Sequence, residues 1–143
     1  MLNQLFFSTI LLVTATEALL NTVGWTQSVT VTGRLICNGE PATGVKLKLY
    51  DDGTGRLMKL EYLNGDSDGT FSISGKHTDI LTIDPKLNIY HRCDYHGLCY
   101  KKLVIFIPHS YVTDGETAER AYDIGTLNLQ NRIVGETTDC INW

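Results

Sequence analysis

The sequence lacks any hydrophobic run close to the roughly 20 residues that a membrane-spanning helix requires. Positive charge is also scarce, because 12 Lys and Arg stand against 16 Asp and Glu, for a formal net charge of −4. Since nucleic-acid binding depends on basic surfaces, we expect no nucleic-acid partner. The missing hydrophobic run leads us to expect no transmembrane segment. The 143 residues, 43% hydrophobic and 20% charged, suit one globular domain.

Catalytic motifs are missing as well. The sequence contains no G-x-S-x-G, no H-E-x-x-H and no phosphate-binding glycine loop. Four histidines, at 77, 91, 96 and 109, are scattered, and the sequence does not show whether any two converge. His109 adjoins Ser110, but adjacency in sequence does not make a catalytic pair. We therefore predict that the protein is not an enzyme and that it has no catalytic residues and no cofactor.

Two acidic segments invite a metal interpretation, and turn chemistry explains both. The segment N-G-D-S-D-G at 64–69 matches the first half of a calcium-binding loop, but Gly75 stands where that loop needs a bidentate Glu. A hairpin turn is the preferred interpretation of this segment. The D-D-G sequence at 51–53 is likewise typical of a turn. We predict no metal site.

The N-terminus has the layout of a secretory signal peptide. Leu5–Val13 reads L-F-F-S-T-I-L-L-V, and small residues follow at Ala15 and Ala18, although no Lys or Arg precedes the apolar run. The alternative is a buried N-terminal helix or strand. We expect residues 1–18 to be a signal peptide, residues 19–143 to be the mature domain, and the protein to be secreted and extracellular.

Four cysteines remain in the chain: Cys37, Cys93, Cys99 and Cys140. An even number in a secreted protein favours two disulfides, for which three connectivities exist. Because Cys93 and Cys99 bracket a short polar stretch between two apolar runs, we predict that they pair across the mouth of a hairpin, and that Cys37 pairs with Cys140. The competing interpretation is a metal site in H-R-C-D-Y-H-G-L-C at 91–99, whose spacing is not a standard zinc pattern.

Along the chain, apolar residues recur with period two, which indicates strands. Leu103–Ile107 is continuously apolar and is expected to be a central strand covered on both faces. Gly125 interrupts the last alternation and suggests a bulge. Turn sequences separate the segments, which predicts a single antiparallel β-sandwich of about seven or eight strands, immunoglobulin-like, with its core at about residues 27–140. The strands are expected at 28–37, 45–50, 70–74, 87–92, 103–107 and 122–129, with a weaker one at 58–62 and at most one helical turn within 108–118.

Several stretches, in order, resemble one family. They are V-T-V-T-G-R-L-I-C-N-G-E-P-A-T-G-V-K-L-K-L-Y-D, D-G-T-F-S-I-S-G, I-D-P-K-L-N-I-Y-H-R-C, R-A-Y-D-I-G-T-L-N-L and the closing D-C. Together they are similar to the nematode transthyretin-like proteins from about Ser28 to Cys140. The resemblance implies a secreted, prealbumin-like β-sandwich that binds an extracellular ligand or a cell-surface or lipid component.

The same superfamily includes hydroxyisourate hydrolases and hormone carriers. The hydrolases end in Y-R-G-S and use His and Arg, whereas this chain ends in T-T-D-C-I-N-W and has Arg34 but no histidine before His77. We therefore expect a non-catalytic binding module, monomeric and with a filled core. The alternative is a carrier of a small hydrophobic ligand, which needs a cavity or an oligomer channel. The ligand and the residues that bind it are not evident from the sequence.

Overall fold

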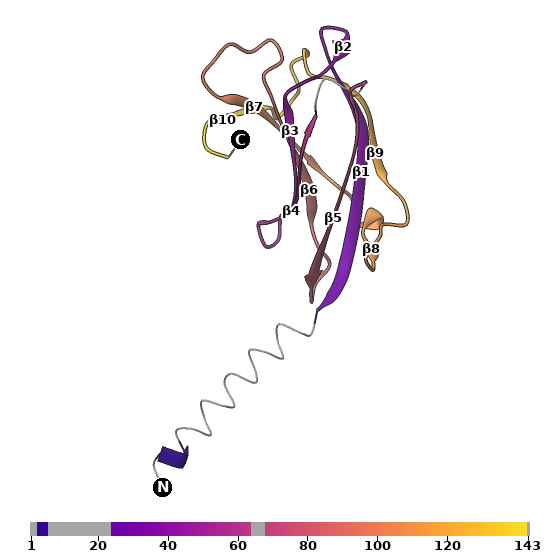
Figure 1. Ribbon diagram of the computed structural model, residues 1–143, viewed down its shortest axis with the longest axis vertical. Helices are drawn as coiled ribbons and strands as arrows, with labels where there is room; N and C mark the ends of the chain where they lie inside the picture. The colour runs from indigo at the N-terminus through magenta and orange to yellow at the C-terminus, as the bar shows by residue number, and fades with distance from the viewer. Residues whose placement is uncertain (1–2, 6–23, 64–67, 143) are drawn as a thin grey trace.

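The alternating segments form two facing β-sheets in the computed structural model, which describes residues 3–5, 24–63 and 68–142 (Figure 1). One sheet contains β1 (Trp25–Cys37), β2 (Glu40–Pro41), β5 (Thr70–Asp79), β8 (Thr113–Asp114) and β9 (Tyr122–Asn128). The other has the order β10-β7-β6-β3-β4, with β3 (Val45–Asp51), β4 (Arg56–Leu63), β6 (Pro85–His91), β7 (Tyr100–Phe106) and β10 (Thr137–Asp139). A short 3-10 helix, η1 (His109–Tyr111), lies between β7 and β8. The prediction of an antiparallel β-sandwich is confirmed.

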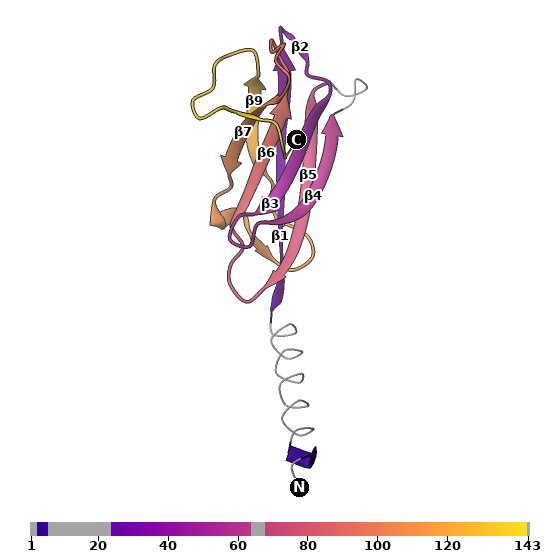
Figure 2. The ribbon, with the colours of Figure 1, turned by 90° about the vertical axis from the view of Figure 1, so that its left-hand side faces the viewer.

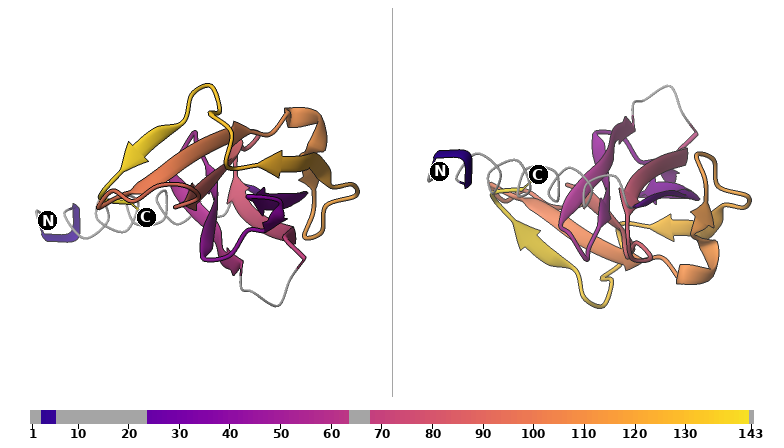
Figure 3. Two further views of the ribbon diagram at one scale, coloured as in Figure 1. Left: turned by 90° about the horizontal axis from the view of Figure 1, so that it is seen from above. Right: turned by 90° about the horizontal axis from the view of Figure 1, so that it is seen from below.

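The core lies between the two sheets, which form two layers when the molecule is viewed along its long axis (Figure 3). Strand residues with period two project alternately inward and outward, so each strand contributes every second side chain to the core. The buried apolar cluster consists of Val29, Val31, Leu35, Ala42, Val45, Leu47, Leu49, Leu63, Phe71, Ile73, Leu87, Ile89, Leu103, Ile107 and Leu129.

Strand β1 is the centre of the first sheet. It pairs with β5 from Trp25 to Arg34 in antiparallel register, and with β9 in parallel register. The register between β1 and β9 shifts between Thr32 and Arg34, and Gly125 has a φ of +72°, which confirms the predicted bulge. Parallel pairing is possible because the chain crosses from one sheet to the other through η1 and β8 before β9 begins.

Two local predictions are wrong. Strand β7 is not covered on both faces, because Phe106 is 65% exposed while Leu103 and Ile107 are buried. Residues 64–69 do not close a hairpin, because β4 before them and β5 after them belong to different sheets. Of that segment, residues 64–67 lie outside the described residues, and Asp68 accepts hydrogen bonds from the backbone and side chain of Thr70.

The predicted disulfide pairing is also wrong. The bridges are Cys37–Cys93, with 5.8 Å between the Cα atoms, and Cys99–Cys140, with 4.7 Å. Strand β10 pairs with β7 so that Asp139 lies opposite Tyr100, which makes Cys140 the neighbour of Cys99. A three-residue edge strand contains too little alternation to be recognised from the sequence. Without β10, the sequence does not show that Cys140 lies beside Cys99.

Most of the predicted signal peptide, residues 1–18, lies outside the described residues, which include only 3–5 of it. Its cleavage therefore stays a prediction. Among the described residues, no helical segment has both the length and the apolar character needed to cross a membrane.

Candidate functional site

The outer face of the sheet β10-β7-β6-β3-β4 collects lysine and tyrosine side chains. Directly paired residues of neighbouring strands project to the same side of a sheet, so the strand register determines which side chains meet there. One such row runs Tyr62, Lys46, Tyr90, Lys102 across β4, β3, β6 and β7. The next two rows are Leu60, Lys48, Asn88, Val104 and Leu57, Tyr50, Lys86, Phe106.

We call this surface the lysine face and define it by four lysines and three tyrosines: Lys46, Lys48, Lys86, Lys102, Tyr50, Tyr62 and Tyr90. Each ammonium group lies against a tyrosine ring, at distances that allow a cation–π interaction. The distances from Nζ to the ring centroid are 5.4 Å for Lys46 and Tyr62, 5.2 Å for Lys48 and Tyr90, 5.9 Å for Lys102 and Tyr90, and 5.9 Å for Lys86 and Tyr50.

Like charges crowd together on this face. Burial lowers the pKa of Lys48, and the nearby charges of Lys46 and Lys102 lower it further, against an opposing effect of Asp139. Burial raises the pKa of Tyr50 and of Tyr90, so both phenols stay neutral at physiological pH. An anion placed among these ammonium groups would relieve their mutual repulsion.

Two carboxylates lie at the margin of the lysine face. The Asp139 carboxylate is 3.5 Å from the Lys102 ammonium, and Asp52 pairs with Lys86. Hydrogen bonds from the backbone N–H groups of Asn142 and Ile141 lower the pKa of Asp139 to about 2, so it is charged throughout the physiological range. Among the described residues, four lysines against two carboxylates give this surface a positive charge, on a chain whose net charge is −4.

The C-terminal segment crosses the same face, as Figure 2 shows from the front. Lys48 donates a hydrogen bond to the carbonyl of Asn142, and Tyr90 is fully buried although it projects outward from β6. Asn88 donates from its amide to the Tyr90 hydroxyl, at 3.2 Å. Its Oδ1 is buried without a hydrogen-bond partner among the described residues. This acceptor therefore lies beneath the face and is not open to solvent.

The four predicted disulfide cysteines are all oxidised, and they anchor both ends of loop 93–99 between β6 and β7. Arg92 stiffens this loop, because its guanidinium donates to the Cys99 carbonyl at 2.7 Å and lies 5.3 Å from the Tyr100 ring centroid. Leu98 at the loop is 97% exposed. Both cysteines of 91–99 are in disulfides, so neither offers a free thiolate to a zinc ion in this structure.

Three of the four histidines pair with separate carboxylates. The Cys93 N–H donates to Nδ1 of His91, so the proton of His91 lies on Nε2 and is donated to Glu136. His109 bonds to Asp84, and not to its neighbour Ser110 in a nucleophile–base arrangement. The pairs are His77 with Asp51 at 2.9 Å, His91 with Glu136 at 2.9 Å, and His109 with Asp84.

The lysine face was not identified from the sequence, although the sequence does show the residues that β3 contributes to it. The alternation of Lys46, Lys48 and Tyr50 with apolar residues places these three on one side of a strand. What the sequence could not supply was the register between β3 and β6 that brings Tyr90, and with it Lys102, beside them, because Lys46 and Tyr90 are 44 residues apart.

Comparison with known proteins gives a consistent family match. A model of the transthyretin-like family matches residues 32–108. Transthyretin-like protein 5 of Caenorhabditis elegans is 46% identical over 84% of this chain and 88% of its own length. Transthyretin-like protein 33 of the same nematode is 41% identical over 82% of this chain and 85% of its own, and transthyretin-like protein 2 is 37% identical over 92% and 95%.

Proposed function

Because this chain belongs to the transthyretin-like family, we propose that it is a secreted, non-catalytic binding module whose lysine face attaches to an anionic component of the cell surface. The observation that carries the proposal is the set of four lysines held against tyrosine rings on one sheet face. Secretion is supported by the apolar N-terminal run and by the two disulfides, which persist in oxidising compartments.

We assign the anion to phospholipid headgroups in a membrane surface. The lysine face is bordered by large apolar side chains that are partly or mostly exposed, namely Leu57, Leu60 and Phe106. Lysines near an anionic bilayer contribute about 1 kcal/mol each, and apolar side chains beside them can enter the interfacial region. The module acts as a monomer in this proposal, and the part of the lysine face that the C-terminal segment leaves open turns toward the membrane.

The carrier alternative receives no support from a specific feature. A carrier needs an apolar cavity, whereas the inner faces of the two sheets meet through buried side chains such as Leu47, Ile73 and Leu87. The hollow lined by His91, Cys93 and Tyr100, for example, opens on the surface and not into the core.

The test is vesicle binding with a matched lysine control. The full-length secreted protein is mixed with vesicles of phosphatidylcholine alone or with added phosphatidylserine, and bound protein is measured by flotation. The double variant Lys46→Gln/Lys48→Gln should lose about 2 kcal/mol of binding, or roughly 30-fold in affinity. The control Lys76→Gln removes a lysine of the other sheet that pairs with Glu116, and it should bind like the unmodified protein.

Three outcomes would contradict this proposal. The first is equal binding to both kinds of vesicle, which would show that charge does not drive attachment. The second is an equal loss in the control variant. The third is binding to a soluble sulfated glycan such as heparin without any binding to phosphatidylserine vesicles, which would assign the lysine face to a different anion.

A further inference from the structure

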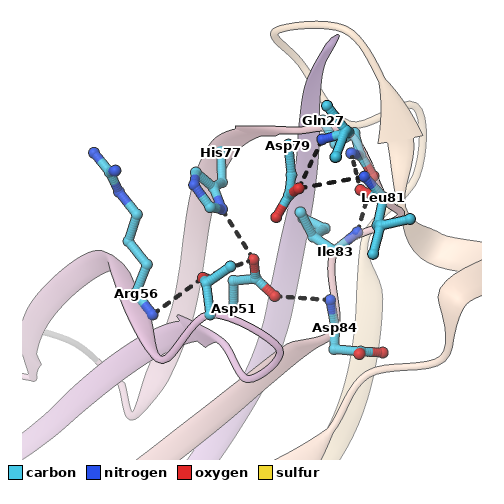
Figure 4. A network of polar contacts seen from close by, with 10 residues as sticks. Gln27, Asp51, Arg56, His77, Asp79, Leu81, Ile83 and Asp84 are labelled. Carbon is cyan, nitrogen blue, oxygen red and sulfur yellow. Dashed lines mark hydrogen bonds and ion pairs between the residues drawn. The ribbon is translucent and has the colours of Figure 1, made fainter. Parts of the chain in front are cut away.

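A histidine and two aspartates converge at the end of the sandwich opposite the disulfides. Candidate ligand atoms of Asp51, His77 and Asp79 all lie within 4.8 Å of one another. In Figure 4 the Asp51 carboxylate and the His77 imidazole point toward each other, and the Asp79 carboxylate lies beside them. These three residues are not part of the lysine face, and the proposed membrane binding does not use them.

Strand periodicity explains how these side chains meet. Asp51 is the last residue of β3 and continues the inward positions of Val45, Leu47 and Leu49. His77 and Asp79 are two positions apart near the end of β5, so they share one side of the other sheet. The group therefore joins the two sheets where their apolar contact ends.

The Asp51 carboxylate is held in its charged form although it is 1% exposed. Burial raises its pKa, but hydrogen bonds from the Asp84 N–H at 3.0 Å, from His77 at 2.9 Å and from the Thr54 hydroxyl at 3.0 Å outweigh that effect, so the pKa is lowered. Asp51 is thus a fixed anion with one edge turned toward His77.

Asp79 places a second carboxylate within 4.8 Å of the His77 imidazole nitrogen. Its Oδ1 accepts the N–H of Ile80 at 2.6 Å and of Leu81 at 3.3 Å, which fixes the orientation of the side chain. The other acidic residues at this end, Asp52 and Asp84, each have a cation or histidine of their own. Two carboxylates within 4.8 Å of one imidazole nitrogen form a donor set with excess negative charge, which favours a divalent cation.

Solvent reaches this group from one side. A surface hollow lined by Thr54, Arg56, His77 and Asp79 opens next to it. An ion can therefore enter without unfolding of the sandwich, and water from the hollow can complete its coordination.

We propose that Asp51, His77 and Asp79 bind a divalent transition-metal ion, with Zn²⁺ as the best fit to one imidazole nitrogen and two carboxylate oxygens. Nδ1 of His77 is the coordinating nitrogen, so its remaining proton lies on Nε2. The ion replaces the hydrogen bond between His77 and Asp51. Asp51 keeps its bonds from Thr54 and from the Asp84 N–H, which orient it as a ligand. The bound ion links β3 of one sheet to β5 of the other.

The experiment uses the full-length protein, stripped with a chelator and dialysed, then titrated with Zn²⁺ in a calorimeter and melted with and without the metal. The unmodified protein should bind one equivalent and melt at a higher temperature with Zn²⁺. Asp79→Asn keeps the Oδ1 acceptor for the turn but removes the ligand charge, and it should bind at least tenfold more weakly with little metal-induced change in melting temperature.

The matched control is Asp84→Asn, which neutralises the exposed Asp–His pair formed with His109 and leaves the backbone N–H that bonds to Asp51. It should bind Zn²⁺ like the unmodified protein. His77→Gln is the second ligand variant, and circular dichroism of the stripped proteins checks that each variant folds. The proposal is overturned if the unmodified protein binds no Zn²⁺, if folded Asp79→Asn and His77→Gln both bind normally, or if Asp84→Asn loses binding to the same extent.

Discussion

Removal of the two disulfides one at a time should destabilise the protein by different amounts. The bridges Cys37–Cys93 and Cys99–Cys140 span sequence separations of 56 and 41 residues. In the chain-entropy model, loops of these lengths are each worth about 4 kcal/mol, and they differ by only ~0.3 kcal/mol. Loop length alone therefore predicts nearly equal losses.

Packing separates the two bridges. Cys37 and Cys93 contact the hydrophobic core, so replacing them with alanine also removes buried sulfur contacts worth about 1 kcal/mol. We expect Cys37→Ala/Cys93→Ala to cost about 5 kcal/mol and Cys99→Ala/Cys140→Ala about 4 kcal/mol. Losses of this size are comparable to the whole stability of many domains, so both variants should be near the unfolding threshold at room temperature.

Urea denaturation of both double variants and the unmodified protein, fitted with a common m-value, measures the difference. Non-reducing peptide mapping provides the control, because it should yield one peptide pair with Cys37 and Cys93 and another with Cys99 and Cys140. A clearly larger loss for Cys99→Ala/Cys140→Ala would refute the packing argument, and a Cys37–Cys140 peptide pair would refute the connectivity itself.

Two further variants test local features of the fold. Gly69→Ala should cost at least about 2 kcal/mol in urea denaturation, because φ is +87° and a Cβ would lie 2.3 Å from the Leu35 carbonyl oxygen. Gly39→Ala is its control, with a similar φ of +78° but no atom within 4 Å, so an equal loss would rule out the clash. Asp139→Asn tests pH dependence, because the pKa of Asp139 in the folded protein is lowered from 3.8 to about 2. The charged carboxylate therefore stabilises the fold above about pH 4, and this stabilisation is lost as the pH falls toward 2. The variant should be less stable at pH 7 by up to about 2 kcal/mol, and the difference should close in acid; a gap that persists at pH 2 would contradict this.

The regular strands could be predicted because their alternation is local. Ser28–Cys37, Val45–Tyr50 and Leu87–Arg92 each contain enough residues for period two to be visible. All three fall on strands of the structure, apart from Arg92, which follows the end of β6. Strands of two or three residues, such as β8 and β10, contain at most one repeat of the pattern. Their existence depends on the neighbours that they pair with, which are far away in the sequence.

The same limit applied to the candidate sites. A cysteine pairing or a lysine cluster depends on which strands lie side by side and in which register, and that is a property of the whole sandwich. Asp51 illustrates the point, because its sequence context, D-D-G, is that of a turn. Only the packing of β5 over the end of β3 reveals that its carboxylate is buried against His77.

The order of the two bridges along the chain has a consequence for proteolysis. The loop closed by Cys37–Cys93 ends before the loop closed by Cys99–Cys140 begins, so the two do not overlap in the sequence. The covalent structure is therefore two consecutive rings joined by a tether, residues 94–98. A cut inside either ring leaves a single covalent molecule, whereas a cut in the tether produces two separately cyclised pieces. Each piece would contain strands of both sheets, since β7, β9 and β10 follow the tether. With Leu98 97% exposed on that tether, a single protease cut there would convert the protein into a non-covalent heterodimer, which can dissociate without any reducing agent.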